Sequence, residues 1–148
     1  SGEAERWARN SPRERLAAVI ALDQFSRNIF RGAAAAFEND AMALRLTHDA
    51  IASGDDLALK PVERWFLYMP LEHSESEADQ RLSVEKFSEL LKQCEPEHRE
   101  QFAAALDFAR RHAEVIETFG RFPHRNDALG RDSSSAELAF LKTTPGGF

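Results

Sequence analysis

The side chains best suited to chemistry gather between positions 119 and 131, in FGRFPHRNDALGR, which holds Arg121, His124, Arg125, Asn126 and Arg131. Guanidinium groups bind carboxylates and phosphates through two parallel hydrogen bonds, so such a group of side chains can converge on an anion. The same side chains can instead satisfy the backbone groups of an irregular connection. These residue types leave both interpretations open, a ligand site or a fastened corner.

A second polar group lies in LDQFSRNIFRG, residues 22–32. At about 100° per residue, a helix places Asp23 and Arg27 on the face that also carries Leu16. The two charged residues are four apart and can pair. Desolvation makes unpaired buried charges costly, so the pair is either a structural ion pair or the floor of a pocket. The adjacent flank carries Gln24, Asn28 and Arg31.

A third polar group lies in PLEHSESEADQ, ahead of a predicted helix. Acidic residues such as Glu75 and Asp79 are ordinary at a helix N-terminus, but His73 is not explained in that way. As a metal ligand, His73 would need Glu72, Glu75 or His124 as partners, and no HExxH spacing occurs. We therefore predict no metal site, and no cofactor.

Known catalytic motifs are missing from the sequence. There is no GxSxG elbow and no GxxxxGK[ST] phosphate loop, and Cys94 has no neighbouring base. Acid–base chemistry by paired carboxylates stays open, because any two of Asp23, Glu72, Glu75 and Asp79 can meet across helices. The sequence identifies no catalytic residue and does not decide whether the protein is an enzyme.

Helix start and stop signals recur in the first half of the chain. Ser11, Pro12 and Glu14 form a capping-box pattern that predicts a helix over 12–29. Early acidic residues and Gly54 predict a second helix over 38–53.

Similar signals continue in the second half. A short third helix begins at Pro61, and we expect Pro70 to interrupt it. The spacing of Ser74 and Glu77 predicts a capped fourth helix over 75–94. A fifth helix runs from Pro96 to the stop at Gly120. The last predicted helix is SAELAFLK, capped by Ser134 and Glu137.

The predicted fold is all-α, with about six helices, because no segment alternates as a strand does. Short loops join successive helices, which favours antiparallel helix pairs. At 148 residues the chain fits one domain, over 1–148.

The overall charge narrows the function classes. A formal net charge of −6 argues against nonspecific nucleic-acid binding. No run approaches the roughly 20 apolar residues of a membrane-spanning helix, and no signal sequence opens the chain. Cys94 is the single cysteine, which excludes an internal disulfide. We predict a cytoplasmic protein, without a prediction of its oligomeric state.

Three stretches together, LDQFSRNIFRG, YMPLEHSE and FGRFPHRNDALGR, resemble domain-of-unknown-function family 924, found mostly in bacteria, and the closing TPGGF is similar as well. The resemblance implies a helical fold like that of tetratricopeptide repeat proteins, and it implies no activity. Ser26 stands where the family pattern usually has proline. Family members also carry further residues ahead of the segment that begins here at Ser1, so we expect an N-terminal helical part of the family's domain to be missing.

Two functions compete on this basis. The first is a cleft for a small anionic ligand, with or without catalysis, where the three polar groups converge. It would be contradicted if the groups lay far apart, or if every arginine were already paired with a protein carboxylate. Its residues are Asp23, Gln24, Arg27, Asn28, Arg31, His73, Glu75, Arg121, His124, Arg125, Asn126 and Arg131.

The second is a tetratricopeptide-repeat-like module whose concave surface holds a peptide or partner protein. An exposed aromatic patch, from Trp65, Phe66 and Tyr68, would favour it.

Overall fold

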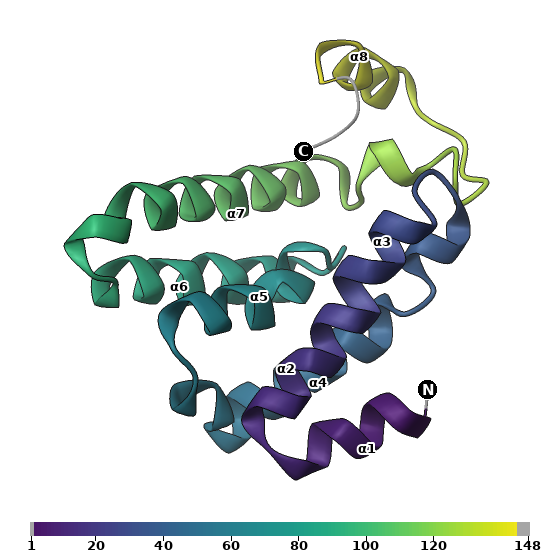
Figure 1. The fold of residues 1–148 in the computed structure, drawn as a ribbon. Helices are drawn as coiled ribbons and strands as arrows, with labels where there is room; N and C mark the ends of the chain where they lie inside the picture. Colours follow the sequence, from purple (N-terminus) through teal and green to yellow (C-terminus); the bar gives the residue numbers. More distant parts are fainter. Residues whose placement is uncertain (1, 145–148) are drawn as a thin grey trace.

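A computed structural model describes residues 2–144, and these form seven separate helices without a strand (Figure 1). The first half contains α1 (Gly2–Asn10), the continuous helix α2 (Pro12–Ile20), π-helical turn (Ala21–Phe25) and α3 (Ser26–Ile29), and then α4 (Asp40–Ser53). The second half contains α5 (Pro61–Glu72), α6 (Glu77–Gln93), α7 (Arg99–Phe119) and α8 (Ser135–Thr143). Short 3-10 turns cover Ala34–Phe37, Asp55–Ala58, Pro96–His98 and Pro123–Arg125.

The all-α prediction is confirmed, with two differences in the helices. Helix α1 was not predicted and accounts for the seventh helix. Pro70 does not interrupt α5, which continues to Glu72. Proline removes one backbone donor, and near the end of a helix that loss affects only the last turn. The side chain of Gln80 also donates hydrogen bonds to carbonyls at this end, including that of Glu72 at 2.8 Å.

Most of the predicted helix ends are found. Ser11 accepts a hydrogen bond from the backbone of Glu14, and Ser134 and Glu137 form a complete capping box. Gly120 ends α7 with a φ of 69°, a left-handed conformation that glycine adopts without steric cost. The Ser74–Glu77 box does not form, because α6 begins later, and the Ser74 hydroxyl donates to Asp79 instead.

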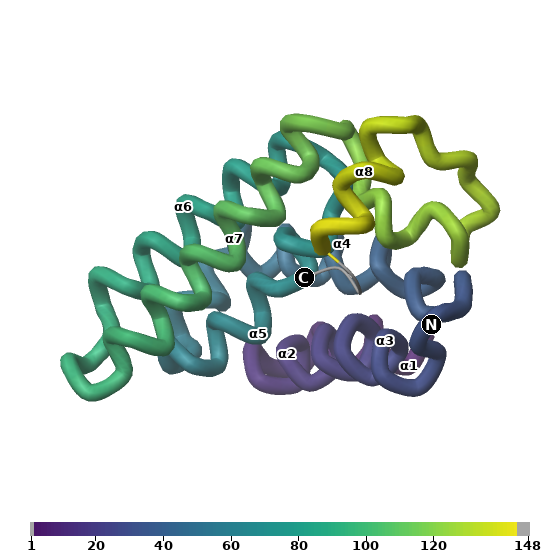
Figure 2. The backbone as a smooth tube through the Cα atoms, turned by 90° about the horizontal axis from the view of Figure 1, so that it is seen from above, coloured from purple at the N-terminus to yellow at the C-terminus, as the bar shows by residue number. Residues whose placement is uncertain are grey.

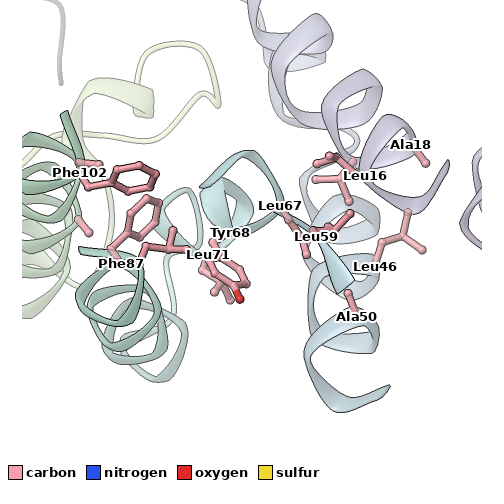
Figure 3. Packing of buried hydrophobic residues seen from close by; sticks show 14 of the residues in the cluster. Leu16, Ala18, Leu46, Ala50, Leu59, Leu67, Tyr68, Leu71, Phe87 and Phe102 are labelled. Atoms are coloured by element: carbon pink, nitrogen blue, oxygen red, sulfur yellow. The ribbon is translucent and has the colours of Figure 1, made fainter. Parts of the chain in front are cut away.

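Helix α5 is the centre of the molecule. Helices α6 and α7 are antiparallel to each other, and α6 packs along one side of α5 (Figures 1 and 2). Helices α2 and α4 pack on the other side of α5, and α1 packs against α2. Figure 3 shows Leu67, Tyr68 and Leu71 of α5 between Phe87 and Phe102 on one side and Leu16, Leu46 and Ala50 on the other. The core therefore depends on one helix that is apolar on two faces.

The aromatic residues of α5 do not form an exposed patch. Tyr68 is buried and donates a hydrogen bond to Asp56 at 2.6 Å. The ring of Trp65 packs against Phe87 and Phe102, and only Phe66 is exposed, at 41%. Within residues 2–144, no helix is long and apolar enough to cross a membrane.

We expect Leu67→Ala to lower the free energy of unfolding by about 2–5 kcal/mol, because it leaves a cavity at a fully buried position. Leu57→Ala is the matched control, since Leu57 is 68% exposed and should change stability by less than about 0.5 kcal/mol. Urea denaturation of both variants measures the difference. Equal effects would mean that α5 is not the core helix.

Candidate functional site

The site begins at the buried carboxylate of Asp23, in the π-helical turn between α2 and α3. One of its oxygens accepts hydrogen bonds from His73 Nδ1 at 2.6 Å and from Arg27 Nε at 3.1 Å. The other accepts from Gln24 Nε2 at 2.6 Å. Asp23 therefore joins the first helix to the end of α5.

The environment fixes the protonation of this pair. Burial by itself would raise the pKa of Asp23, but the hydrogen bond and charge of His73, together with Arg27, lower it to about 2. Burial lowers the pKa of His73 against the opposing effect of Asp23, which favours a neutral ring at pH 7. Nδ1 then carries the proton donated to Asp23, which leaves Nε2 as the unprotonated ring nitrogen. An unprotonated imidazole nitrogen is able to accept a proton.

Asp40 links the first helix to the 121–131 segment. Its Oδ2 accepts from Arg27 Nη2 at 2.8 Å and lies 3.4 Å from Arg125 Nη1. Arg125 also donates to the backbone carbonyl of His73 at 2.8 Å. Its guanidinium lies between the rings of Phe37 and Phe122, 4.8 and 4.5 Å from their centres. Arg125 is thus an internal strut rather than an open ligand group.

Glu75 secures the 121–131 segment to the start of α6. Its carboxylate accepts two hydrogen bonds from Arg131, at 2.7 and 2.9 Å, and a third from the backbone N–H of Phe122 at 2.8 Å. Arg131 also donates to the carbonyl of Phe122 at 3.2 Å. The Arg131–Glu75 ion pair therefore holds the 121–131 segment at two points, Phe122 and Arg131.

Two further candidates of this segment, Arg121 and Asn126, turn toward α8. Arg121 donates to both carboxylate oxygens of Glu137, at 2.6 and 2.9 Å. The buried amide of Asn126 donates to Ser133 at 3.0 Å and to Glu137 at 3.3 Å. These contacts attach α8 to the body of the protein.

A pocket of about 1060 Å³ lies beside this network, lined by residues at the end of α3 and in the connection to α8. Figures 1 and 2 show the backbone of these two segments side by side. Six of the predicted site residues line it: Gln24, Arg27, Asn28, Arg31, His124 and Arg131. Its wall also includes Phe37, Leu138 and Leu141. The other six predicted residues lie outside its lining: Asp23, His73, Glu75, Arg121, Arg125 and Asn126.

The arginines of the site differ in their partners. Arg27, Arg121, Arg125 and Arg131 each contact a protein carboxylate. Arg31 is exposed and makes one hydrogen bond, to Asn28 Oδ1 at 3.3 Å, with no carboxylate within 4.0 Å among residues 2–144. The three polar groups thus lie together, and Arg31 differs from the other four predicted arginines in contacting no carboxylate within residues 2–144.

The chain matches, over residues 1–145, the family described as "Bacterial protein of unknown function (DUF924)". It belongs to this family. A solved structure, that of the protein of unknown function ATU0120 from Agrobacterium tumefaciens, is similar at a TM-score of 0.80 and 32% identity. The alignment covers 95% of this chain and 73% of that one. Among curated proteins, none matches.

In this DUF924 protein, Asp40 and Phe37 contact or line the candidate site although they are not among its predicted residues. The sequence indicated Asp40 only as an early acidic residue of a helix, yet its carboxylate pairs with Arg27 and Arg125. The surplus of arginines over acids in the 119–131 stretch was the available signal that carboxylates from elsewhere must approach. The described residues contain no group of three or more His, Cys, Asp or Glu side chains placed to hold a metal ion.

The carboxyl group of Glu72 is the unusual member of the network. It is buried, 5% exposed, and no hydrogen bond to it is found among the described residues. Burial, assisted by the negative charge of Asp23, raises the pKa of Glu72 to about 8. The folded protein therefore holds this carboxyl protonated between about pH 5 and pH 8, where the unfolded chain ionises it.

We expect Glu72→Gln to stabilise the protein relative to the parent by an amount that grows as pH rises from 5 to 8. In this window the unfolded state binds fewer protons, so the parent loses up to about 1.4 kcal/mol per pH unit through Glu72. Thermal unfolding across this pH range measures it, with the exposed Glu85→Gln as control. A difference independent of pH would place an ionised Glu72 in the native state.

We expect Arg131→Lys to destabilise the protein by about 1–2 kcal/mol, because lysine cannot make the forked pair with Glu75. Arg81→Lys is the control, since Arg81 and Glu77 form an exposed pair worth less than about 0.5 kcal/mol. Urea denaturation in low salt compares the variants, since urea is uncharged and does not screen the ion pairs. A similar small effect at both positions would contradict a stabilising role for the Arg131–Glu75 pair.

Proposed function

We propose that this protein binds a small molecule carrying an anionic group in the pocket between α3 and the connection to α8. The observation that carries the proposal is Arg31, an exposed guanidinium on the pocket wall without a carboxylate partner in the described part of the chain. A volume of about 1060 Å³ accommodates a metabolite-sized ligand. Phe37, Leu138 and Leu141 supply an apolar part of the wall.

Internal pairing supports the binding role of this pocket. Arg27 and Arg131 line the wall while bonded to Asp23, Asp40 and Glu75, so their positions are set before a ligand arrives. A preorganised wall lowers the entropy lost on binding. The Asp23–His73 pair lies behind this wall and outside the lining, so we propose binding rather than turnover.

Thermal-shift measurements against carboxylates, phosphorylated metabolites and divalent metal salts test the proposal. A ligand at one hundred times its Kd stabilises the native state by about 2.7 kcal/mol, which raises the melting temperature. We expect anionic compounds to give such shifts, and Arg31→Gln to abolish them. Arg110→Gln is the matched control, an exposed arginine on α7 away from the pocket. No shift across the panel, or shifts unchanged in Arg31→Gln, would overturn the proposal.

A second candidate, a tetratricopeptide-repeat-like interaction module, is favoured by a different observation. The side chains of Phe25, Ile29 and Phe30 are 58%, 69% and 46% exposed, and they lie together around α3. Exposed apolar groups of this kind are typical of protein contact surfaces. Peptide or protein binding that is lost in Ile29→Ser and kept in Arg31→Gln would support this candidate over the first.

A further inference from the structure

The charges of the pocket wall point to the chemistry of its ligand, and this inference rests on the function proposed above. Arg27 contacts Asp23 and Asp40, and Arg131 is bonded twice to Glu75, so neither offers a free charge. His124 is neutral at pH 7, because burial and the charge of Arg125 lower its pKa to about 4.

Three charged residues of the wall remain without an ion-pair partner within 4.0 Å in residues 2–144, namely Arg31, Asp127 and Asp132. Arg31 follows α3, whereas the two carboxylates belong to the connection that leads to α8. All three are exposed, and all three line the same pocket. The two segments thus present opposite free charges to one space.

A ligand with only negative charge fits this distribution poorly. It would gain the attraction of Arg31 and would also approach Asp127 and Asp132, two exposed carboxylates without an ion pair within 4.0 Å in residues 2–144, and such like-charge contacts weaken binding. A ligand with a carboxylate and an ammonium group meets a partner at both ends. The apolar residues Phe37, Leu138 and Leu141 can cover the part between its charged groups.

We propose that the ligand is a small zwitterion of the amino-acid type, such as a short peptide with free termini. Its carboxylate pairs with Arg31, and its ammonium group pairs with Asp127 and Asp132. At about 1060 Å³, the pocket has room for a peptide of a few residues.

Matched derivatives of one peptide test this assignment on the whole chain. A thermal-shift panel of free dipeptides with apolar, polar and charged side chains first selects the best binder. Calorimetry then compares that dipeptide with its N-acetyl form, which is an anion, and its C-terminal amide, which is a cation. We expect the free dipeptide to bind at least tenfold more tightly than either derivative.

The variants assign the two charged ends. Arg31→Gln should weaken the free dipeptide and the N-acetyl form at least tenfold and leave the amide unchanged. The double variant Asp127→Asn and Asp132→Asn should weaken the free dipeptide and the amide, but not the N-acetyl form. Arg110→Gln and Asp49→Asn, exposed residues outside the pocket, are the controls.

Each contrary outcome has a separate meaning. If the N-acetyl form binds as tightly as the free dipeptide, the zwitterion is overturned and the anion-binding function stands. If no dipeptide binds while other anions of the metabolite panel do, the zwitterion is likewise overturned and the anion-binding function stands. If the amide binds as tightly as the free dipeptide and Arg31→Gln changes nothing, both proposals are overturned.

Discussion

The ionised carboxylate of Asp23, 1% exposed, is the charge around which the polar end of this protein is arranged. A charge removed from water in this way is tolerated only when hydrogen bonds replace its hydration. The three donors come from Gln24, Arg27 and His73. Arg27 and His73 each make a further contact with another part of the chain. Arg27 reaches Asp40, and the backbone of His73 receives Arg125. The demand of one buried carboxylate thus organises contacts across three distant parts of the chain.

This organisation separates two roles that the sequence presents together. The residues that donate hydrogen bonds to the carboxylates of Asp23 and Glu75 hold α3, α5, α6 and the 121–131 segment in place. Their charges are largely neutralised by these ion pairs. The pocket is formed on the outer side of these pairs, where Arg31 and two exposed aspartates have no ion-pair partner within 4.0 Å in residues 2–144. The inner layer gives the wall its shape, and the outer layer supplies the charge that a ligand meets.

The helices were largely predictable because their signals are local. Proline and serine at helix starts and glycine at helix ends act within a few residues, as the Ser134–Glu137 box illustrates. Helix α1 was missed although its signals are also local, with Glu3 and Glu5 in its first turn and Arg9 in its last. The other missed features depend on distant neighbours, as with Pro70, which stays helical where the side chain of Gln80 bonds the carbonyls at the end of α5. The same reason applies to the site: Arg27 and Asp23 share a helix and were paired from spacing, whereas Arg125 and Asp40 are 85 residues apart.

The π-helical turn at Ala21–Phe25 separates the first long helix into two parts with different tasks. Side chains before it, such as Leu16 and Val19, belong to the buried core, and those after it, such as Asn28 and Arg31, belong to the pocket. A widened turn accommodates an extra residue, and in a regular helix one extra residue rotates everything beyond it by about 100°. The π-helical turn therefore changes the rotation of the helix between its core-facing part and its pocket-facing part. It lets the direction of the pocket-lining side chains be set without altering the packing of the core.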